Sequence, residues 1–221
     1  MRLGLIGDVH AEDQLLGLAL DALQRLQVER ILCTGDIVDG PGDIDRTCRL
    51  LVQADVIVVR GNHDRWIRAD EMRTLPHAHR MTELDVGTIG FLKDLPVSTF
   101  VEVPEGKLLL CHGVGGNDMC RLVADTRGYG ISTNEDLLAL LFNPSITFMV
   151  GGHTHQPMVR RFERGGGKPP LIVVNPGTLA RDGEPGFSVL DLAARRVERY
   201  RLPSLGALTV SAVSTVSLDD A

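Results

Sequence analysis

Apolar runs and amphipathic stretches alternate over the first third of the chain. Three short apolar runs, each followed closely by glycine and an acidic or amide residue, predict buried strands at residues 2–6, 31–34 and 56–59. Between them, apolar residues three or four positions apart predict two amphipathic helices. The second helix spans residues 44–53, and the first carries on one face Leu15, Ala19, Ala22, Leu23 and Leu26. This alternating order predicts parallel strands joined by right-handed crossovers.

Beyond residue 64 the pattern is less regular. Helices are expected at residues 65–73 and 83–94, and another from a Ser132 cap, with Glu135 as its capping-box partner, to Phe142. A glycine-rich loop is expected at 114–131, and residues 203–221 carry no strong signal. Strands are expected at 97–103, 107–111 and 147–150. Turn-separated runs then predict an antiparallel meander at 158–162, 171–174, 187–191 and 197–201.

Length, charge and cysteine usage narrow the class of protein. At 221 residues we expect a single domain over residues 1–202, with 203–221 as a C-terminal tail. The net charge of −6 and the few aromatic residues argue against a strong nucleic-acid surface and against a membrane partner. The four cysteines have no metal-binding or disulfide-framework spacing, and no segment has the length of a leader or a membrane span. A cytoplasmic location is therefore expected.

Chemically capable side chains gather where the apolar runs end. Because ligands bind beyond the carboxyl ends of parallel strands, these side chains are expected to form one site. Imidazole and oxygen ligands without thiolate suit Mn, Fe, Zn, Ni or Co, and seven candidates are too many for one zinc. They suit two metals that share a carboxylate. The seven ligand candidates are Asp8, His10, Asp36, Asn62, His112, His153 and His155, and His63 and Asp64 lie among them.

Two pairs of candidate ligands are spaced two positions apart along the chain. In extended backbone the side chains of Asp8 and His10 would point the same way, as would those of His153 and His155. The two side chains of each pair are therefore expected to contact the same bound group.

Five motifs, in order along residues 7–155, resemble the signatures of calcineurin-like metallophosphoesterases. A sixth segment, Asn175-Pro-Gly-Thr178, is similar to a turn of the small bacterial and archaeal phosphodiesterase-like branch. The resemblance implies an α/β (α+β) fold with four α-β-β-α layers, in which two mixed β-sheets pack as a sandwich with flanking helices. The motifs are Asp8-x-His10, Gly35-Asp36-x-x-Asp39, Gly61-Asn-His-Asp64, Cys111-His112-Gly113 and Gly152-His-Thr-His155.

The same resemblance implies roles for individual residues. Metal one would be held by Asp8, His10, Asp36 and His155, and metal two by Asp36, Asn62, His112 and His153, with Asp36 bridging. A hydroxide between the metals would attack phosphorus in line with the leaving oxygen. His63 would protonate that oxygen, and Asp64 would orient His63. Manganese is the first expectation for both metals, with Fe, Zn, Ni and Co as alternatives.

The expected activity is that of a phosphoric ester hydrolase acting on a small phosphoester, with phosphodiesters preferred. Two divalent ions and their anionic ligands leave a centre of about +1, which balances a diester monoanion. The 114–131 loop is expected to set substrate choice. Candidate phosphate-binding arginines, each weighed against an ordinary surface position, are Arg65, Arg121 and Arg127.

Other functions remain open at this point. A protein or nucleotide phosphatase would use the same centre, but Gly40 and Asp64 depart from the arginine and glutamate of those branches. A non-catalytic interaction scaffold is disfavoured because His63 and all the ligands are present. Asp39 is expected to be structural, the histidines His77 and His79 to be solvated, and homo-oligomerisation is left open.

Overall fold

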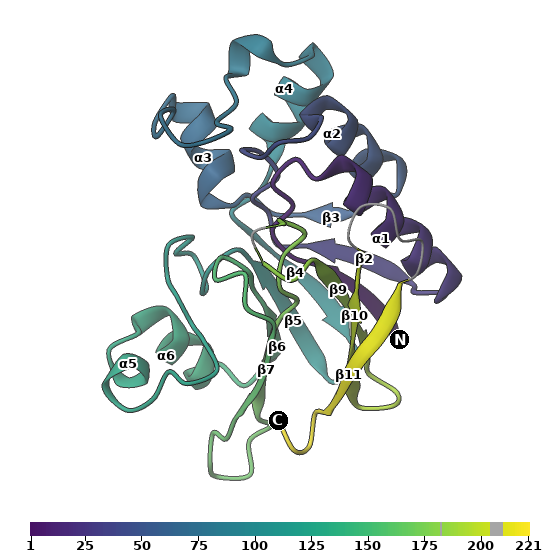
Figure 1. Cartoon of the computed structure of the whole chain (residues 1–221). Coiled ribbons are helices and arrows are strands. Elements are labelled where there is room, and N and C mark those ends of the chain that lie inside the picture. The colour runs from purple at the N-terminus through teal and green to yellow at the C-terminus, as the bar shows by residue number, and fades with distance from the viewer. Residues whose placement is uncertain (182, 204–209) are drawn as a thin grey trace.

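Two mixed β-sheets pack face to face, and helices cover the outer face of each (Figure 1). The computed structural model describes residues 1–181, 183–203 and 210–221. The six-stranded sheet has the order β11-β10-β9-β1-β2-β3, and the five-stranded sheet has the order β4-β5-β6-β8-β7. The four-layer fold expected from the resemblance is therefore confirmed.

The first sheet is parallel at one side and antiparallel at the other. Strand β1 pairs in parallel with β2, and β2 with β3, while β9, β10 and β11 run antiparallel to their neighbours. Its strands are β1 (Arg2–Ile6), β2 (Arg30–Cys33), β3 (Ile57–Val58), β9 (Gly186–Asp191), β10 (Arg196–Arg201) and β11 (Ser211–Ser217). The second sheet contains β4 (Ser98–Val103), β5 (Gly106–Cys111), β6 (Ile146–Val150), β7 (Met158–Phe162) and β8 (Leu171–Asn175).

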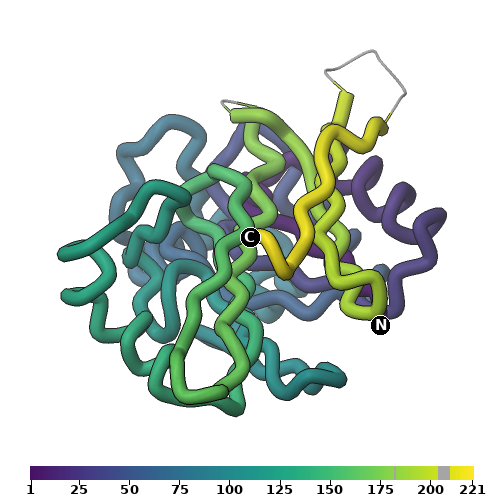
Figure 2. Tube along the Cα trace, turned by 90° about the horizontal axis from the view of Figure 1, so that it is seen from below, coloured from purple at the N-terminus to yellow at the C-terminus, as the bar shows by residue number. Residues whose placement is uncertain are grey.

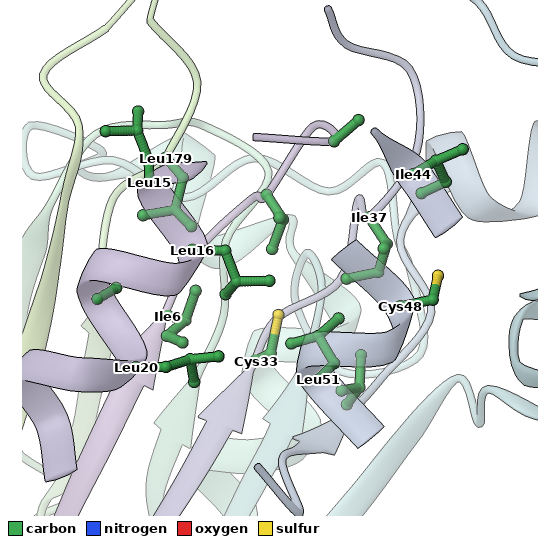
Figure 3. Close-up of a cluster of buried hydrophobic side chains, with 14 of the residues drawn as sticks. Ile6, Leu15, Leu16, Leu20, Cys33, Ile37, Ile44, Cys48, Leu51 and Leu179 are labelled. Carbon is green, nitrogen blue, oxygen red and sulfur yellow. The ribbon is translucent and has the colours of Figure 1, made fainter. Parts of the chain in front are cut away.

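Side-chain alternation along β1 explains the layering. Leu3 and Leu5 are fully buried in the apolar cluster between the two sheets, and Ile6 joins the cluster under the first helices. Figure 3 shows that second cluster, where Leu16 of α1 and Leu51 of α2 meet the sheet. The helices are α1 (Asp13–Arg25), α2 (Ile44–Gln53), α3 (Asn62–Ala69), α4 (Val86–Asp94), α5 (Tyr129–Ser132) and α6 (Glu135–Phe142), with a 3₁₀ turn, η1 (Met81–Glu83).

Three expectations about local structure need correction. The last four predicted strands do not form one meander, because β7 and β8 belong to the second sheet and β9 and β10 to the first. Helix α6 is capped by Asn134, whose side chain accepts from the Leu137 amide at 3.0 Å, and not by Ser132. Helix α3 begins at Asn62 and not at Arg65, so the Asn-His-Asp motif forms its first turn.

The C-terminal residues contribute to both sheets. Strand β11 extends the first sheet, and Leu218 is fully buried between the sheets. The chain then ends beside the second sheet, where the Arg161 amide donates to the Ala221 carbonyl at 3.2 Å (Figure 2). The weak sequence signal over 203–221 thus hides a strand at Ser211–Ser217, while residues 204–209 lie outside the described residues. The domain division at residue 202 stays a prediction.

No helix in the described parts of the chain is long and apolar enough to cross a membrane.

Candidate dimetal centre

The carboxyl ends of parallel strands from both sheets meet at one place. Asp8 follows β1, Asp36 follows β2, and Asn62 opens the helix after β3. From the second sheet, His112 follows β5 and His153 follows β6. Within the described residues, two groups could each hold a metal ion, because their ligand atoms lie within 4.8 Å of one another. The groups are His10–Asp36–His63 and Asp36–His112–His153, so Asp36 belongs to both.

The backbone at the centre is held in the left-handed region. Positive φ angles occur at His10 (46°), Asp36 (47°), His153 (65°) and His155 (57°). Such angles are uncommon outside glycine and tend to cluster at functional sites, where the surrounding fold holds them. The expectation that the i, i+2 pairs lie in extended backbone is therefore wrong, and the ligands are aimed by tight turns.

The second group brings lone pairs together in a buried space. His112 Nδ1 lies 2.8 Å from the Thr34 carbonyl, which can only accept, so Nδ1 carries hydrogen. His112 Nε2 then faces Asn62 Oδ1 at 2.9 Å and Asp36 Oδ2 at 3.3 Å. Burial opposes a charge on this imidazole, but Asp36 raises the pKa of His112 to about 10. The contacts therefore call for a positive charge, either a proton or a metal ion.

Beside the first group lies an acceptor that no proton on His112 satisfies. Asp8 Oδ2 is fully buried and accepts no hydrogen bond within the described chain, and it lies 3.2 Å from His155 Nε2. His10 donates from Nδ1 to the Asp39 carbonyl at 2.9 Å, which leaves the lone pair of Nε2 pointing at His155 Nε2, 3.1 Å away. A buried carboxylate oxygen and two facing imidazole nitrogens are the donor set of a divalent cation.

Two glycines leave room for these carboxylates. A Cβ on Gly61 would collide with Asp36 Oδ1, and a Cβ on Gly152 would collide with Asp8 Oδ1. Together with the buried Asp8 oxygen, this close approach means that the residues present fit a pair of divalent metal ions.

His63 is held by Asp39 and not by Asp64. Its Nδ1 lies 2.8 Å from Asp39 Oδ2, and the buried guanidinium of Arg73 donates to both Asp39 oxygens at 2.8 Å. Burial alone would lower the pKa of His63, but the Asp39 contact raises it above its usual value. The expectation that Asp64 orients His63 is therefore corrected, and Asp39, expected to be structural only, takes that place.

Asp64 instead stabilises the turn that carries the motif. Its fully buried carboxylate accepts from the amides of Gly61 (2.9 Å), Ile37 (2.8 Å) and Val38 (3.3 Å). The Gly61 contact caps α3, and the other two tie α3 to the segment after β2. Burial, reinforced by the charge of Asp36, raises the pKa of Asp64 to about 6.

The predicted arginines do not line the cavity beside the centre. This cavity, of about 550 Å³, is lined by metal-ligand residues and by Trp66, Leu75, Pro76, His77 and Arg181 among others. Arg65 is held by a two-bond contact to Asp118 (2.7 and 3.0 Å), and Arg127 donates to the Ala124 and Thr126 carbonyls. Arg121 is exposed.

Of the two histidines expected in solvent, His77 is exposed, as expected, whereas His79 is half-buried. His77 lines this cavity, and His79 exchanges two hydrogen bonds with Asp39, each 3.0 Å long. Sequence reasoning missed these residues together with Trp66 and Arg73. Trp66 lies on α3, whereas Arg73, His77 and His79 lie on the irregular segment after it, which has no motif and which only tertiary contacts bring to the centre.

The turn after β8 braces the metal-ligand loops. Asn175 donates to the Gly152 carbonyl at 2.8 Å and to Thr154 Oγ1 at 3.0 Å. The Thr178 hydroxyl donates to the Asp8 carbonyl at 2.9 Å. The turn therefore ties the loop after β1 to the loop after β6.

Comparison with known families fits this geometry. A family model, the calcineurin-like phosphoesterase superfamily domain, matches residues 1–195. The chain belongs to this superfamily. Its resemblance to the metallophosphoesterases, expected from the motifs, is confirmed. The comparison with curated proteins gave no match.

Solved structures share the fold of this superfamily member. A metallophosphoesterase from Sphaerobacter thermophilus is 23% identical, with a TM-score of 0.68 over 92% of this chain and 89% of that one. Yfce, a phosphoesterase from E. coli, is 18% identical, with a TM-score of 0.55 over 99% and 100%. A single mutant of Vps29 from Entamoeba histolytica is 21% identical, with a TM-score of 0.54 over 98% of both chains. At these identities the likeness shows the fold alone.

Proposed function

We propose that this protein is a dimetal-dependent phosphoester hydrolase that prefers phosphodiesters, with manganese as the first candidate for both metals. The observation that carries the proposal is the buried Oδ2 of Asp8, which has no hydrogen-bond partner in the described chain, together with Asp36, which belongs to both candidate metal groups. Metal one is assigned to Asp8, His10, Asp36 and His155, and metal two to Asp36, Asn62, His112 and His153. Two divalent cations, when bound, lower the pKa of a water molecule and offset the charge of phosphoryl oxygens.

The residues of this chain supply the remaining roles. Thr34 and Asp39 accept from the Nδ1 atoms of His112 and His10, which keeps the Nε2 lone pairs directed at the centre. Asp39 likewise holds Nδ1 of His63, so Nε2 is the nitrogen that exchanges a proton with a leaving oxygen in the cavity. Asp64 keeps the His63 turn in place by capping α3.

The charge of the cavity supports a diester over a monoester. Gly40, at the position where phosphatase branches carry arginine, lines the cavity without a charge. Arg181 is the arginine among the described lining residues, and it pairs at 2.8 Å with Glu12, which is 2% exposed. Its charge is therefore largely offset, and the described lining supplies no second arginine and no lysine for the second negative charge of a monoester.

The phosphatase alternative uses the same centre and is tested by the same experiment. The protein is reconstituted with manganese, and kcat/KM is measured for bis-p-nitrophenyl phosphate and p-nitrophenyl phosphate at one pH. We expect the diester to be favoured. A tenfold preference for the monoester would make the protein a phosphatase, and metal binding without turnover of any ester would favour an interaction scaffold.

A further inference from the structure

Trp66 is the only tryptophan of the chain, and it lies beside His63. The two residues are three positions apart on α3, so both rings project from the same side of the helix. Their ring centroids are 4.7 Å apart, with an interplanar angle of 61°. Trp66 is only partly buried and lines the cavity beside the metal centre. The part of the indole that His63 does not cover therefore faces the space that a ligand occupies.

The cavity surface continues from Trp66 into apolar side chains of the following loop. Leu75 and Pro76 line the same cavity, and we call Trp66, Leu75 and Pro76 the apolar wall. Phosphoryl chemistry needs charged and polar groups, which these three side chains do not supply. Apolar surface in a cavity with a few convergent polar groups is typical of a site that binds the apolar part of a ligand.

The apolar wall is fixed to the carboxylate that holds His63. Arg73, two residues before Leu75, is 4% exposed and donates to both oxygens of Asp39. Beyond the wall, the His79 amide donates to the same carboxylate at 3.0 Å. The loop is thus anchored to Asp39 on both sides of Leu75. Its position relative to His63 is set by a half-buried hydrogen-bond network.

The proposed role of His63 tells which part of a substrate meets this wall. An acid must come within about 3 Å of the oxygen that leaves phosphorus. The His63 ring contacts two rings, that of the candidate metal ligand His10 and that of Trp66, and we place the substituent on that oxygen beside Trp66. The cavity volume of about 550 Å³ is within the range of small-ligand sites, about 300–1,000 Å³. A group as large as a nucleoside can therefore be accommodated.

We propose that the apolar wall stacks a planar aromatic group, either a nucleobase or an aryl ring, on the leaving-group side of the phosphoester. This inference rests on the proposed function and narrows its substrate class. Stacking of one base on an aromatic side chain corresponds to roughly 5- to 150-fold in affinity. Metal coordination of the phosphate is common to all phosphoesters and contributes nothing to this preference.

The test uses the emission of Trp66, which no other tryptophan obscures. Manganese-loaded protein is titrated with adenosine 5′-monophosphate and ribose 5-phosphate, which differ by the base. It is also titrated with phenylphosphonate and cyclohexylphosphonate, which differ in planarity. We expect the aromatic member to bind roughly 5- to 150-fold more tightly and to change the emission saturably. A preference in the first pair alone assigns a nucleobase, and a preference in the second pair alone assigns an aryl ring.

Two variants locate the preference, with affinities measured by calorimetry. Trp66→Leu should retain metal and ribose 5-phosphate binding but lose the preference for the aromatic member. Tyr129→Leu removes an 82% exposed aromatic outside the cavity lining and should keep the preference. A preference that survives in Trp66→Leu would overturn the proposal.

The titrations of the wild-type protein test the proposed aromatic site even if Trp66→Leu does not fold. Equal affinities within both pairs would overturn the aromatic site, while metal-dependent binding of ribose 5-phosphate would leave the proposed function standing. No metal-dependent binding of any of the four compounds would overturn both.

Discussion

The metal-ligand turns and the apolar wall border the same cavity but are built differently. The ligands Asp8, Asp36 and His112 are at most 2% exposed and follow strands of two packed sheets, whereas Pro76 of the wall is exposed on an irregular loop. The turns are fixed by sheet topology and by left-handed backbone angles. The loop part of the wall is held by hydrogen bonds from Arg73 and from the His79 amide to Asp39. The two regions should therefore respond differently to substitution.

The largest effect is expected from Asp36→Asn, because Asp36 belongs to both metal groups. Replacing a residue that hydrogen-bonds to a metal ligand typically lowers metal affinity about 10- to 100-fold. The loss of a ligand shared by two metals should have a larger effect. We expect elemental analysis to show loss of both metals and turnover to fall to background.

Metal binding also gives a stability readout for the same variant. At 100 times its dissociation constant, a metal that binds only folded protein adds about 2.7 kcal/mol per site to the free energy of unfolding. Adding metal should raise the Tm of the wild type and leave that of Asp36→Asn unchanged. The control Asp85→Asn replaces an acid with a 69% exposed side chain and should behave as wild type. Two metals retained by Asp36→Asn would contradict the shared-ligand assignment.

A smaller effect separates the two acids near His63. Asp39→Asn should lower kcat about 10- to 100-fold, because Asp39 orients the proposed acid. Asp64→Asn should mainly destabilise the protein, by about 1–3 kcal/mol, because one amide at the α3 cap loses its acceptor.

Measuring the loss of kcat in Asp39→Asn for esters with different leaving groups tests whether the loss is purely structural. If Asp39 acts through His63, the loss in Asp39→Asn shrinks for esters whose leaving group needs little protonation. The comparison is made on folded, metal-loaded protein, because Asp39→Asn also leaves Arg73 buried without its partner. The same loss for every leaving group, or a larger loss in Asp64→Asn, would restore the original assignment to Asp64.

The clustering of the candidate ligands can be predicted from the sequence because the information for it is local. Each ligand follows a short apolar run, and parallel pairing brings the ends of such runs together. Asp39 has a motif position, but its partners Arg73 and His79 lie 34 and 40 residues away and have no pattern of their own. Asp64 follows His63 directly in the motif, and the resemblance implies that it orients His63. In a helix, however, consecutive side chains point about 100° apart, and a third-position acid reaches back to the cap.

The prediction that the last four strands form one meander is wrong for a related physical reason. The segments of β7, β8, β9 and β10 are short and separated by turns, so their sequences indicate strands without indicating partners. Long-range pairing decides: β8 lies in parallel beside β6, and β9 lies antiparallel beside β1. Strand β11 has mostly exposed residues and therefore carries no strong apolar pattern.

The smallest effect on kinetics is expected from substitutions in the 114–131 loop, which the sequence indicates as the segment that sets substrate choice. Arg121 and Arg127 lie on the loop directly after His112, which is why they were candidates. Both are exposed, Arg127 donates to carbonyls of its own loop, and neither lines the described cavity. Replacing both with alanine should therefore change KM for bis-p-nitrophenyl phosphate by no more than about twofold, the scale of ordinary surface substitutions. Metal content and Tm should match the wild type. A tenfold rise in KM with unchanged metal content would mean that the loop reaches the bound substrate, and substrate choice would then be shared between this loop and the apolar wall.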